Sequence, residues 1–248
     1  MPKKDVRENL THTIEDYLKT IYEITCQGQR ASTNQIAEAL GVTPASVTGM
    51  IKRLASTTPP LLDYKRHHGV RLTPKGELVA LEIVRHHRLL ELFLHQMLGF
   101  EWDEVHAEAD RLEHVISEEF EERIAQALGN PAYDPHGDPI PTRDLVIPDS
   151  PSLRLADLRP GERAIMRRVN DDDPELLRYL GELGLIPGTR LTILGSTPID
   201  HNLTLEIEGA SKPVVVVLGP KITNLISVEI VESANIGKKD ASLRRPDE

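Results

Sequence analysis

The sequence predicts a mainly helical protein that carries a small β domain towards its C-terminal end. Apolar residues recur at helical spacing through the first 128 positions, prolines crowd residues 129–151, and short β-prone runs separated by glycine and proline fill residues 153–231. A chain of 248 residues is long enough for two or three modest domains, each with its own core.

Residues 1–76 have the pattern of a winged helix-turn-helix. A first helix is predicted over residues 10–25, where apolar side chains follow one face. Two short helices follow, over residues 31–41 and 43–54. Ser32 or Thr33 can cap the first of them, and the second begins with Thr43 as cap and Pro44 in its first position. The glycine between the two helices allows the tight turn that this motif needs.

Residues 61–72 are predicted to form two strands that turn at His68 and Gly69, which is a wing. Small helix-turn-helix units also serve as protein-interaction modules, but the basic residues of this wing favour DNA. We expect three parts to contact DNA: the exposed face of the helix over residues 43–54, the wing, and the start of the helix over residues 31–41. These residues are Thr33, Thr43, Ala45, Ser46, Thr48, Gly49, Lys52, Lys65, Arg66 and Arg71.

Charge is divided unevenly along the chain, whose net charge is −10. Residues 1–76 carry 11 basic and 7 acidic side chains, whereas residues 77–142 carry 4 basic and 15 acidic ones. A mildly basic head favours DNA contact, and a strongly acidic middle favours capture of cations or serves solubility.

Residues 77–98 continue a long helix that is apolar on almost every side from Leu89 to Leu98. Such a helix needs burial, and we expect a subunit interface and therefore a homodimer. A further helix is predicted from about Asp103 to Leu128. Its core stripe consists of Val105, Ala109, Leu112, Ile116, Phe120 and Ile124.

Two sets of metal-ligand side chains lie on these helices. His106, Asp110, Glu113 and His114 fall within an arc of roughly 100° on one helix face. On the preceding helix His87 and Glu91 stand four residues apart, and imidazole with carboxylate suits first-row metals. The alternative is two acidic, solvated helix faces.

Other positions narrow the chemistry of such a site. Cys26 is the single cysteine, which excludes an internal disulfide and a thiolate-rich zinc cluster. Asp134 and His136 place further ligand-type side chains inside the proline-rich connector. The sequence has no His-Glu-x-x-His motif or other recognisable nucleophile constellation, so we expect no enzyme.

The C-terminal part is predicted to be a small β-barrel of about five strands, with one short helix near residues 175–183. The strands are expected over residues 162–169, 190–194, 202–207, 213–218 and 225–231. The expected division is a DNA-binding domain over 1–76, a helical dimerisation and metal-binding domain over 77–142, a linker over 143–151, a barrel over 152–232 and a disordered tail over 233–248.

Several motifs in order resemble the diphtheria-toxin-repressor family of iron- and manganese-dependent transcriptional repressors, from about residue 10 to 232. They are the Thr13–Tyr22 segment, the winged helix, Arg85 to Glu91, Val105 to Val115, and Asp134 to Pro141. The barrel, with Leu155 to Gly161 and Leu183 to Gly188, resembles the Src-homology-3-like FeoA domain appended to many members.

The resemblance implies a site near the DNA-binding domain, made by Asp16, Asp110, Glu113 and His114. Iron-responsive members have methionine and cysteine in place of Asp16 and Asp110, so oxygen ligands here favour manganese(II) over iron(II). Lys19 stands where the dinuclear manganese members have a carboxylate, so the resemblance does not imply an identical two-metal cluster.

The resemblance also implies a second site with His87 and Glu91, to which His106 or His136 adds an imidazole. Asp134 replaces a cysteine of manganese-type members, and the barrel is expected to add Asp172 or Asp173. The alternative for the Asp171 to Asp173 triplet is a cap and first-turn charge for the helix that starts at Pro174.

The function implied is a manganese(II)-dependent repressor that binds a palindromic DNA operator as a homodimer, with metal locking the operator-binding arrangement. The first alternative is an iron(II)-dependent repressor, and a less favoured one is a metal-delivery adaptor. No apolar run approaches the roughly 18 residues of a membrane span, and the N-terminal residues lack a signal peptide, so a cytoplasmic protein is expected.

Overall fold

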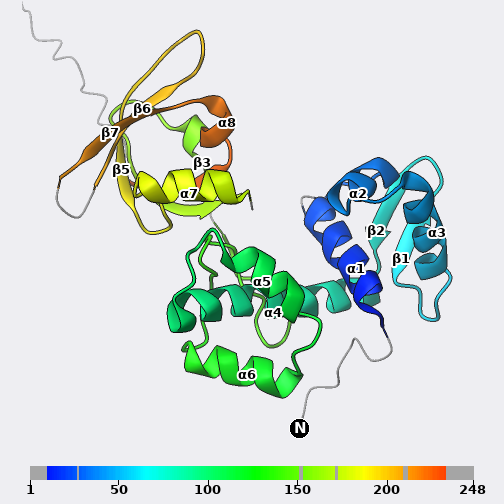
Figure 1. Cartoon of the computed structure of the whole chain (residues 1–248). Coiled ribbons are helices and arrows are strands. Elements are labelled where there is room, and N and C mark those ends of the chain that lie inside the picture. Colours follow the sequence, from blue (N-terminus) through cyan, green and yellow to red (C-terminus); the bar gives the residue numbers. More distant parts are fainter. Residues whose placement is uncertain (1–9, 27, 151–152, 171–172, 209–211, 233–248) are drawn as a thin grey trace, which may run out of the picture. The chain divides into compact units, whose positions relative to one another are not determined.

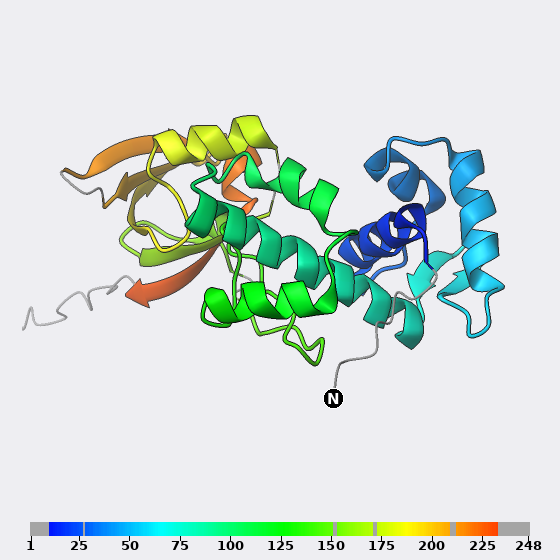
Figure 2. The same ribbon diagram turned by 60° about the horizontal axis from the view of Figure 1, so that its bottom comes forward.

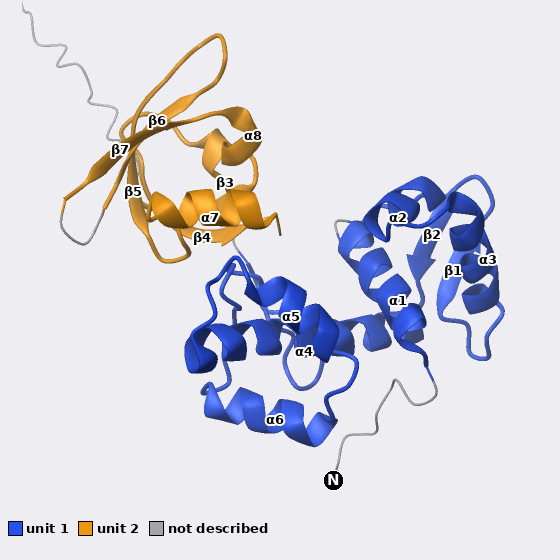
Figure 3. Cartoon of the chain, viewed as in Figure 1, with its two compact units in different colours: residues 1–150 blue, residues 151–248 orange. Residues whose placement is uncertain are grey.

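The computed structural model describes residues 10–26, 28–150, 153–170, 173–208 and 212–232, so the predicted tail over 233–248 lies outside the described residues. The chain forms two compact units, residues 1–150 and residues 151–248 (Figure 3). Within the described ranges, no helix combines the length and apolarity needed to cross a membrane.

The first unit begins with the predicted winged helix-turn-helix. Its elements are α1 His12–Thr25, α2 Thr33–Ala39, α3 Pro44–Ala55, β1 Leu62–Lys65 and β2 Gly69–Leu72 (Figure 1). Ser32 caps α2 and forms a capping box with Gln35. Thr43 caps α3 by accepting a hydrogen bond from the Ser46 amide, so the local sequence sets both helix starts.

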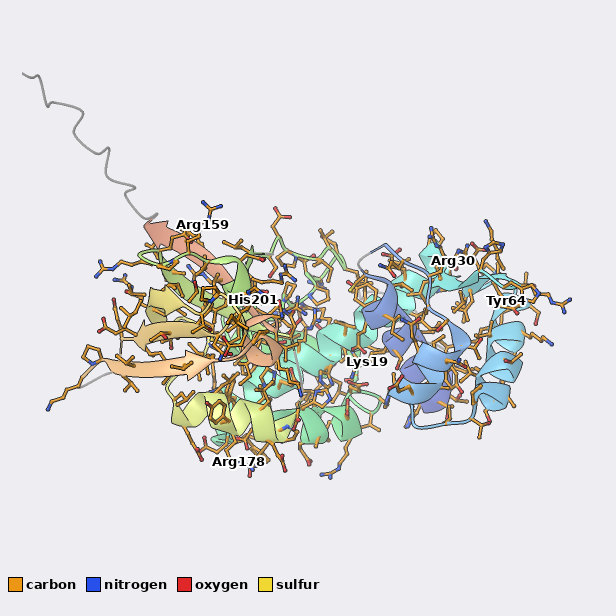
Figure 4. All side chains as sticks on the ribbon, turned by 90° about the horizontal axis from the view of Figure 1, so that it is seen from above. Lys19, Arg30, Tyr64, Arg159, Arg178 and His201 are labelled. Atoms are coloured by element: carbon orange, nitrogen blue, oxygen red, sulfur yellow. The ribbon has the colours of Figure 1, made fainter. Side chains whose placement is uncertain are left out.

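The wing is attached to the start of the helix-turn-helix. Ala31 bridges Val70 of β2, and the Arg30 guanidinium donates to the carbonyl oxygens of Asp63 and Gly69. Gly69 has a φ of 83°, and a Cβ there would lie 2.5 Å from the Ala31 oxygen. Both the turn and this close approach therefore require glycine. Figure 4 labels Arg30 beside this part of the fold.

Helix α4 Pro74–Leu98 runs from the winged helix to the helices that follow it (Figure 2). It belongs to two cores. Its first half, with Val79, Ala80 and Ile83, packs into the core of the winged helix. Its second half, from Leu89 to Leu94, packs with residues of two following helices. His86 and His87 therefore lie on the stretch of α4 between the two cores.

The single helix predicted from Asp103 to Leu128 is wrong. The structure has two helices, α5 Val105–Leu112 and α6 Glu118–Ala127, with a turn between them. Ser117 caps α6 by accepting from the Phe120 amide, which begins a new helix in a new direction. As a result Phe120, expected in the core, is 47% exposed.

The burial of α4 also differs from the expectation. Leu89, Leu90 and Leu94 are buried within their own chain, so a subunit interface is not needed to cover them. Met97 and Leu98, at the end of the helix, are 55% and 58% exposed. This exposed end of the apolar stretch is available to a second subunit.

The second unit is an antiparallel sheet in the order β3-β8-β4-β5-β6-β7, and its described strands form no closed barrel. The sequence predicts about five strands because one strand of this sheet, β3, is only two residues long. The elements are β3 Leu153–Arg154, the 3-10 helix Leu155–Asp157, β4 Arg163–Val169, α7 Pro174–Glu182, β5 Arg190–Ser196, β6 Leu203–Ile207, β7 Val214–Leu218, α8 Pro220–Thr223 and β8 Ile226–Glu232.

Candidate metal centre

Asp16, Glu113 and His114 come together between α1 and the turn that follows α5. Nε2 of His114 lies 2.8 Å from Oδ1 of Asp16 and 3.5 Å from Oε1 of Glu113. Nδ1 lies 2.7 Å from Oε2 of Glu15, and because an ionised carboxylate only accepts, Nδ1 carries the hydrogen. Nε2 is thereby turned towards Asp16 and Glu113, as a metal-binding histidine is commonly oriented by a carboxylate on its other nitrogen.

The surroundings of His114 favour a positive charge. Burial by itself lowers the pKa of His114, but the hydrogen bonds with Asp16 and Glu15 and the charge of Glu113 raise it to about 9. A divalent cation would be attracted by the same carboxylates and would replace that proton.

Lys19 of α1 forms the middle of the site. Its ammonium lies 2.9 Å from Oδ1 of Asp110, 2.8 Å from Oε2 of Glu113 and 3.0 Å from Nδ1 of His87 (Figure 4 labels Lys19). Burial disfavours the charge, but Glu113 and Asp110 raise the pKa of Lys19, so it stays an ammonium that donates to both carboxylates. Asp110 therefore forms an ion pair with Lys19. The resemblance placed Asp110 in one site with Asp16, but the structure does not group these two residues.

His87, Glu91, His106 and Asp110 lie together in a second group. The resemblance assigned His87, Glu91 and His106 to one site but placed Asp110 in the other. Nε2 of His87 lies 2.9 Å from Oε1 of Glu91 and 3.1 Å from Nδ1 of His106. Nε2 of His106 lies 3.5 Å from Oδ2 of Asp110. Two imidazoles and two carboxylates thus converge between α4 and α5.

Glu91 also faces the connector, where Asp134 and His136 are buried beside it. Nε2 of His136 donates to the Trp102 carbonyl at 2.7 Å, and Nδ1 lies 3.8 Å from Oε2 of Glu91. Burial by itself lowers the pKa of His136, but Glu91 and Asp134 raise it to about 9. Burial and the charges of Glu91 and Asp138 raise the pKa of Asp134, so this carboxylate is crowded by negative charge.

The connector is held by Arg88 of α4. Its guanidinium donates to the Pro139 carbonyl at 2.6 Å and to Asp138 at 3.1 Å, and lies 3.7 Å from Oδ2 of Asp134. Oδ1 of Asp134 accepts from the amides of His136 and Asp138. These contacts explain how a segment without helix or strand can hold two candidate ligands in place.

In the acidic triplet before α7, the structure assigns a role to Asp173. Asp173 caps α7, because its Oδ1 accepts from the Glu175 amide at 2.9 Å, which is the alternative that the sequence left open. Asp171 and Asp172 lie outside the described residues, and Asp173 belongs to the second unit.

The donor set fits a first-row divalent ion. Every candidate ligand atom in these groups is an imidazole nitrogen or a carboxylate oxygen. The thiol of Cys26 is exposed and donates a hydrogen bond to the Glu23 carbonyl. Sequence reasoning missed Glu15, although a carboxylate directly before a candidate ligand is a usable signal. It also missed the Trp102 carbonyl, for which a sequence offers no signal.

The predicted DNA-contacting residues lie on α3, on the wing and at the start of α2. Thr43, Ala45, Ser46, Gly49, Lys52, Lys65, Arg66 and Arg71 are exposed, and Thr33 and Thr48 are half-buried. The Thr48 hydroxyl donates to the Pro44 carbonyl, so its hydrogen is already used within α3.

A winged helix-turn-helix beside buried histidines and carboxylates defines the class of metal-responsive DNA-binding regulators. Comparison with known families agrees. The iron-dependent repressor N-terminal DNA-binding domain matches residues 9–70, the iron-dependent repressor metal-binding and dimerisation domain matches 73–142, and the FeoA domain matches 153–230.

Individual relatives extend over most of the chain. The iron-dependent repressor IdeR of Mycobacterium tuberculosis (strain H37Rv) is 32% identical over 234 residues, 90% of this chain and 99% of IdeR. The diphtheria toxin repressor of Corynebacterium efficiens is 32% identical over 209 residues, 79% of this chain and 90% of that repressor. A solved manganese-dependent transcriptional repressor in complex with manganese has a TM-score of 0.78 and 38% identity, over 88% of this chain and 100% of that one. The chain belongs to this family of metal-dependent transcriptional repressors.

Proposed function

We propose that this protein is a manganese(II)-dependent repressor, acting in the cytoplasm as a homodimer on a palindromic operator, and that it is not an enzyme. The observation that carries the proposal is the position of His114, between Asp16 on α1 of the winged helix and Glu113 in the turn after α5. Asp16, Glu113 and His114 would hold a divalent cation, which neutralises the carboxylates and joins the two elements.

Joining α1 to the α5–α6 turn restricts the winged helix relative to the helices that follow it. In a dimer this restriction sets the distance between two α3 helices, which has to match the spacing of DNA half-sites. Because coupling is reciprocal, operator DNA should also tighten metal binding.

The choice of manganese rests on the ligands. Asp16 and Asp110 provide oxygen where a sulfur ligand would favour iron, and the solved manganese-dependent repressor is a similar structure. The names of the sequence relatives favour the alternative, an iron(II)-dependent repressor. Anaerobic titration of the apoprotein with each ion, with operator affinity as the readout, separates the two.

The test of metal coupling uses a DNA fragment selected from a random library by the manganese-loaded protein. Asp16→Asn should remove most of the manganese-dependent gain in affinity measured by fluorescence anisotropy, and Asp149→Asn, at an exposed position, should leave it intact. An affinity that is insensitive both to chelator and to Asp16→Asn would overturn the proposal. A metal-delivery adaptor would select no DNA sequence at all.

The proposed DNA surface has a test of its own. Arg66 is exposed at the tip of the wing, and a phosphate contact there releases counterions when DNA binds. Arg66→Ala should therefore reduce the slope of log affinity against log salt by about 1. Arg159→Ala, at an exposed position of the second unit, should leave the slope unchanged. If the unaltered protein, Arg66→Ala and Arg159→Ala have equal slopes, Arg66 does not contact a DNA phosphate.

A further inference from the structure

Glu82, His86, Glu118 and Glu121 form a cluster on the side of α4 that faces α6. Nε2 of His86 lies 3.3 Å from Oε2 of Glu121, 3.5 Å from Oε1 of Glu118 and 3.9 Å from Oε1 of Glu82. One ligand atom from each residue lies within 4.8 Å of the others. We infer that these four residues form a further divalent-cation site, separate from the proposed sensing centre.

The orientation of His86 is the first reason. Nδ1 lies 3.0 Å from the main-chain oxygen of Glu113, and because a carbonyl oxygen only accepts, Nδ1 carries the hydrogen. In the neutral ring, Nε2 then presents a lone pair to carboxylate oxygens on three sides. This contact is repulsive unless Nε2 carries a proton or a metal cation lies between them. His114 is arranged in the same way, with Nδ1 held by Glu15 and Nε2 facing Asp16 and Glu113.

The charge balance is the second reason. Glu82 and His86 are fully buried and Glu121 is 3% exposed, so uncompensated charge here is costly. Arg85 supplies one positive charge: its Nε lies 2.5 Å from Oε1 of Glu121 and its Nη1 donates to the Pro141 carbonyl at 2.6 Å. Three carboxylates and one guanidinium leave two negative charges when the imidazole is neutral. A divalent cation matches that charge.

Glu118 is the most accessible member of the cluster, with a side chain that is 22% exposed. It shares with Glu121 the wall of a hollow of about 440 Å³ on α6.

The site shares no residue with the proposed sensing centre. His86 and His87 are neighbours on α4, but His86 faces α6, whereas His87 faces Lys19 of α1 and His106 of α5. The two sites meet at Glu113, whose main-chain oxygen holds His86 and whose side chain lies beside His114. An ion held between α4 and α6 would stabilise the turn that carries Glu113. One imidazole and three carboxylates suit manganese(II) or another first-row divalent ion.

The experiment counts manganese ions bound to the full-length protein, from the electron paramagnetic resonance signal of free manganese(II) during a titration. Glu118→Gln should weaken one binding equivalent about tenfold or more and leave the others unchanged, because it replaces a charged ligand at the rim of the cluster. His86→Gln should weaken the same equivalent. Glu119→Gln, the matched control on the exposed face of α6, should bind like the unaltered protein.

Several outcomes distinguish this site from the sensing centre. His114→Ala should lose a different equivalent, and a double variant of His114→Ala with Glu118→Gln should lose both. Anomalous scattering from manganese-grown crystals should place an ion beside Nε2 of His86. If Glu118→Gln and His86→Gln, both folded by circular dichroism, bind manganese like the unaltered protein, the cluster holds a proton and the inference is wrong. If His86→Gln fails to fold, Glu118→Gln decides alone.

Discussion

The ammonium of Lys19 lies 2.8 Å from Oε2 of Glu113, which fixes a positive charge of α1 inside the group of proposed metal ligands. The same ammonium reaches Asp110 and His87. Lys19 therefore takes a position that a second metal ion could occupy, and it links the winged helix to the helical part of the unit by charge.

Replacing Lys19 with a carboxylate should create room and charge for another ion. In Lys19→Glu, the space between Asp110, Glu113 and His87 lacks its ammonium and gains a ligand, so we expect one additional manganese(II) per chain. A manganese titration followed by electron paramagnetic resonance measures this. Lys52→Glu makes the same charge change at an exposed position of α3 and should add none. An unchanged count in Lys19→Glu would show that Lys19 does not stand in for a metal ion.

Glu15 should act through the orientation of His114. Glu15→Gln keeps a hydrogen-bond acceptor at Nδ1 of His114 but removes its negative charge, which makes Nε2 a weaker ligand. Loss of such a partner typically lowers metal affinity about 10–100-fold. Isothermal titration with manganese(II) measures the change, and Glu38→Gln, exposed on α2, is the control. Equal affinities for Glu15→Gln and the control would contradict the role.

Metal binding should release protons, and its affinity should rise with pH. The pKa values of His114 and His136 are raised to about 9 from about 6.5, so both rings are protonated in the apoprotein near neutral pH. A metal ion needs the neutral ring, so the affinity should increase as the pH rises towards about 9 and then level off.

The stability of the apoprotein should change in the opposite direction. Because the folded-state pKa is raised, the contribution of these imidazolium ions to stability is fully present below about pH 6.5 and is lost as the pH passes about 9.

The protons released on metal binding can be counted by calorimetric titrations in buffers of different ionisation enthalpy. His114→Gln should release one proton fewer. A metal affinity independent of pH over this range would refute the assignment of these histidines as ligands.

Gly69 should be essential to the attachment of the wing. An alanine there would be held at a φ of 83° with its Cβ 2.5 Å from the Ala31 oxygen, so Gly69→Ala should lower the free energy of unfolding of this unit by about 1–3 kcal/mol. Gly49→Ala provides the contrast. Gly49 lies inside α3 with no atom within 4 Å of its added Cβ, and the change should stabilise by about 0.5–1 kcal/mol. Urea unfolding measures both, and equal effects would count against a special role for Gly69.

Local sequence was sufficient for the winged helix and for most strands of the second unit. Thr43 and Pro44 begin α3 as predicted, since capping depends on neighbours in the chain. The helix predicted over residues 103–128 failed because Ser117 caps a new helix inside an apolar pattern that continues across the break. A periodic pattern does not reveal a change of direction when both helices bury apolar residues in the same core.

The sequence by itself determined which side chains are available: imidazoles and carboxylates at helical spacing, with aspartate at positions 16 and 110, where the resemblance places sulfur in iron-responsive members. Only the tertiary structure decided how they are grouped, because the packing of α1, α4 and α5 places Lys19 between Asp110, Glu113 and His87 and leaves Asp16 with Glu113 and His114. It likewise turned the neighbours His86 and His87 to different partners, since each backbone step along a helix rotates the side chain by about 100°. Residues that are close in sequence were thus assigned to separate sites, and residues about 100 positions apart were joined in one.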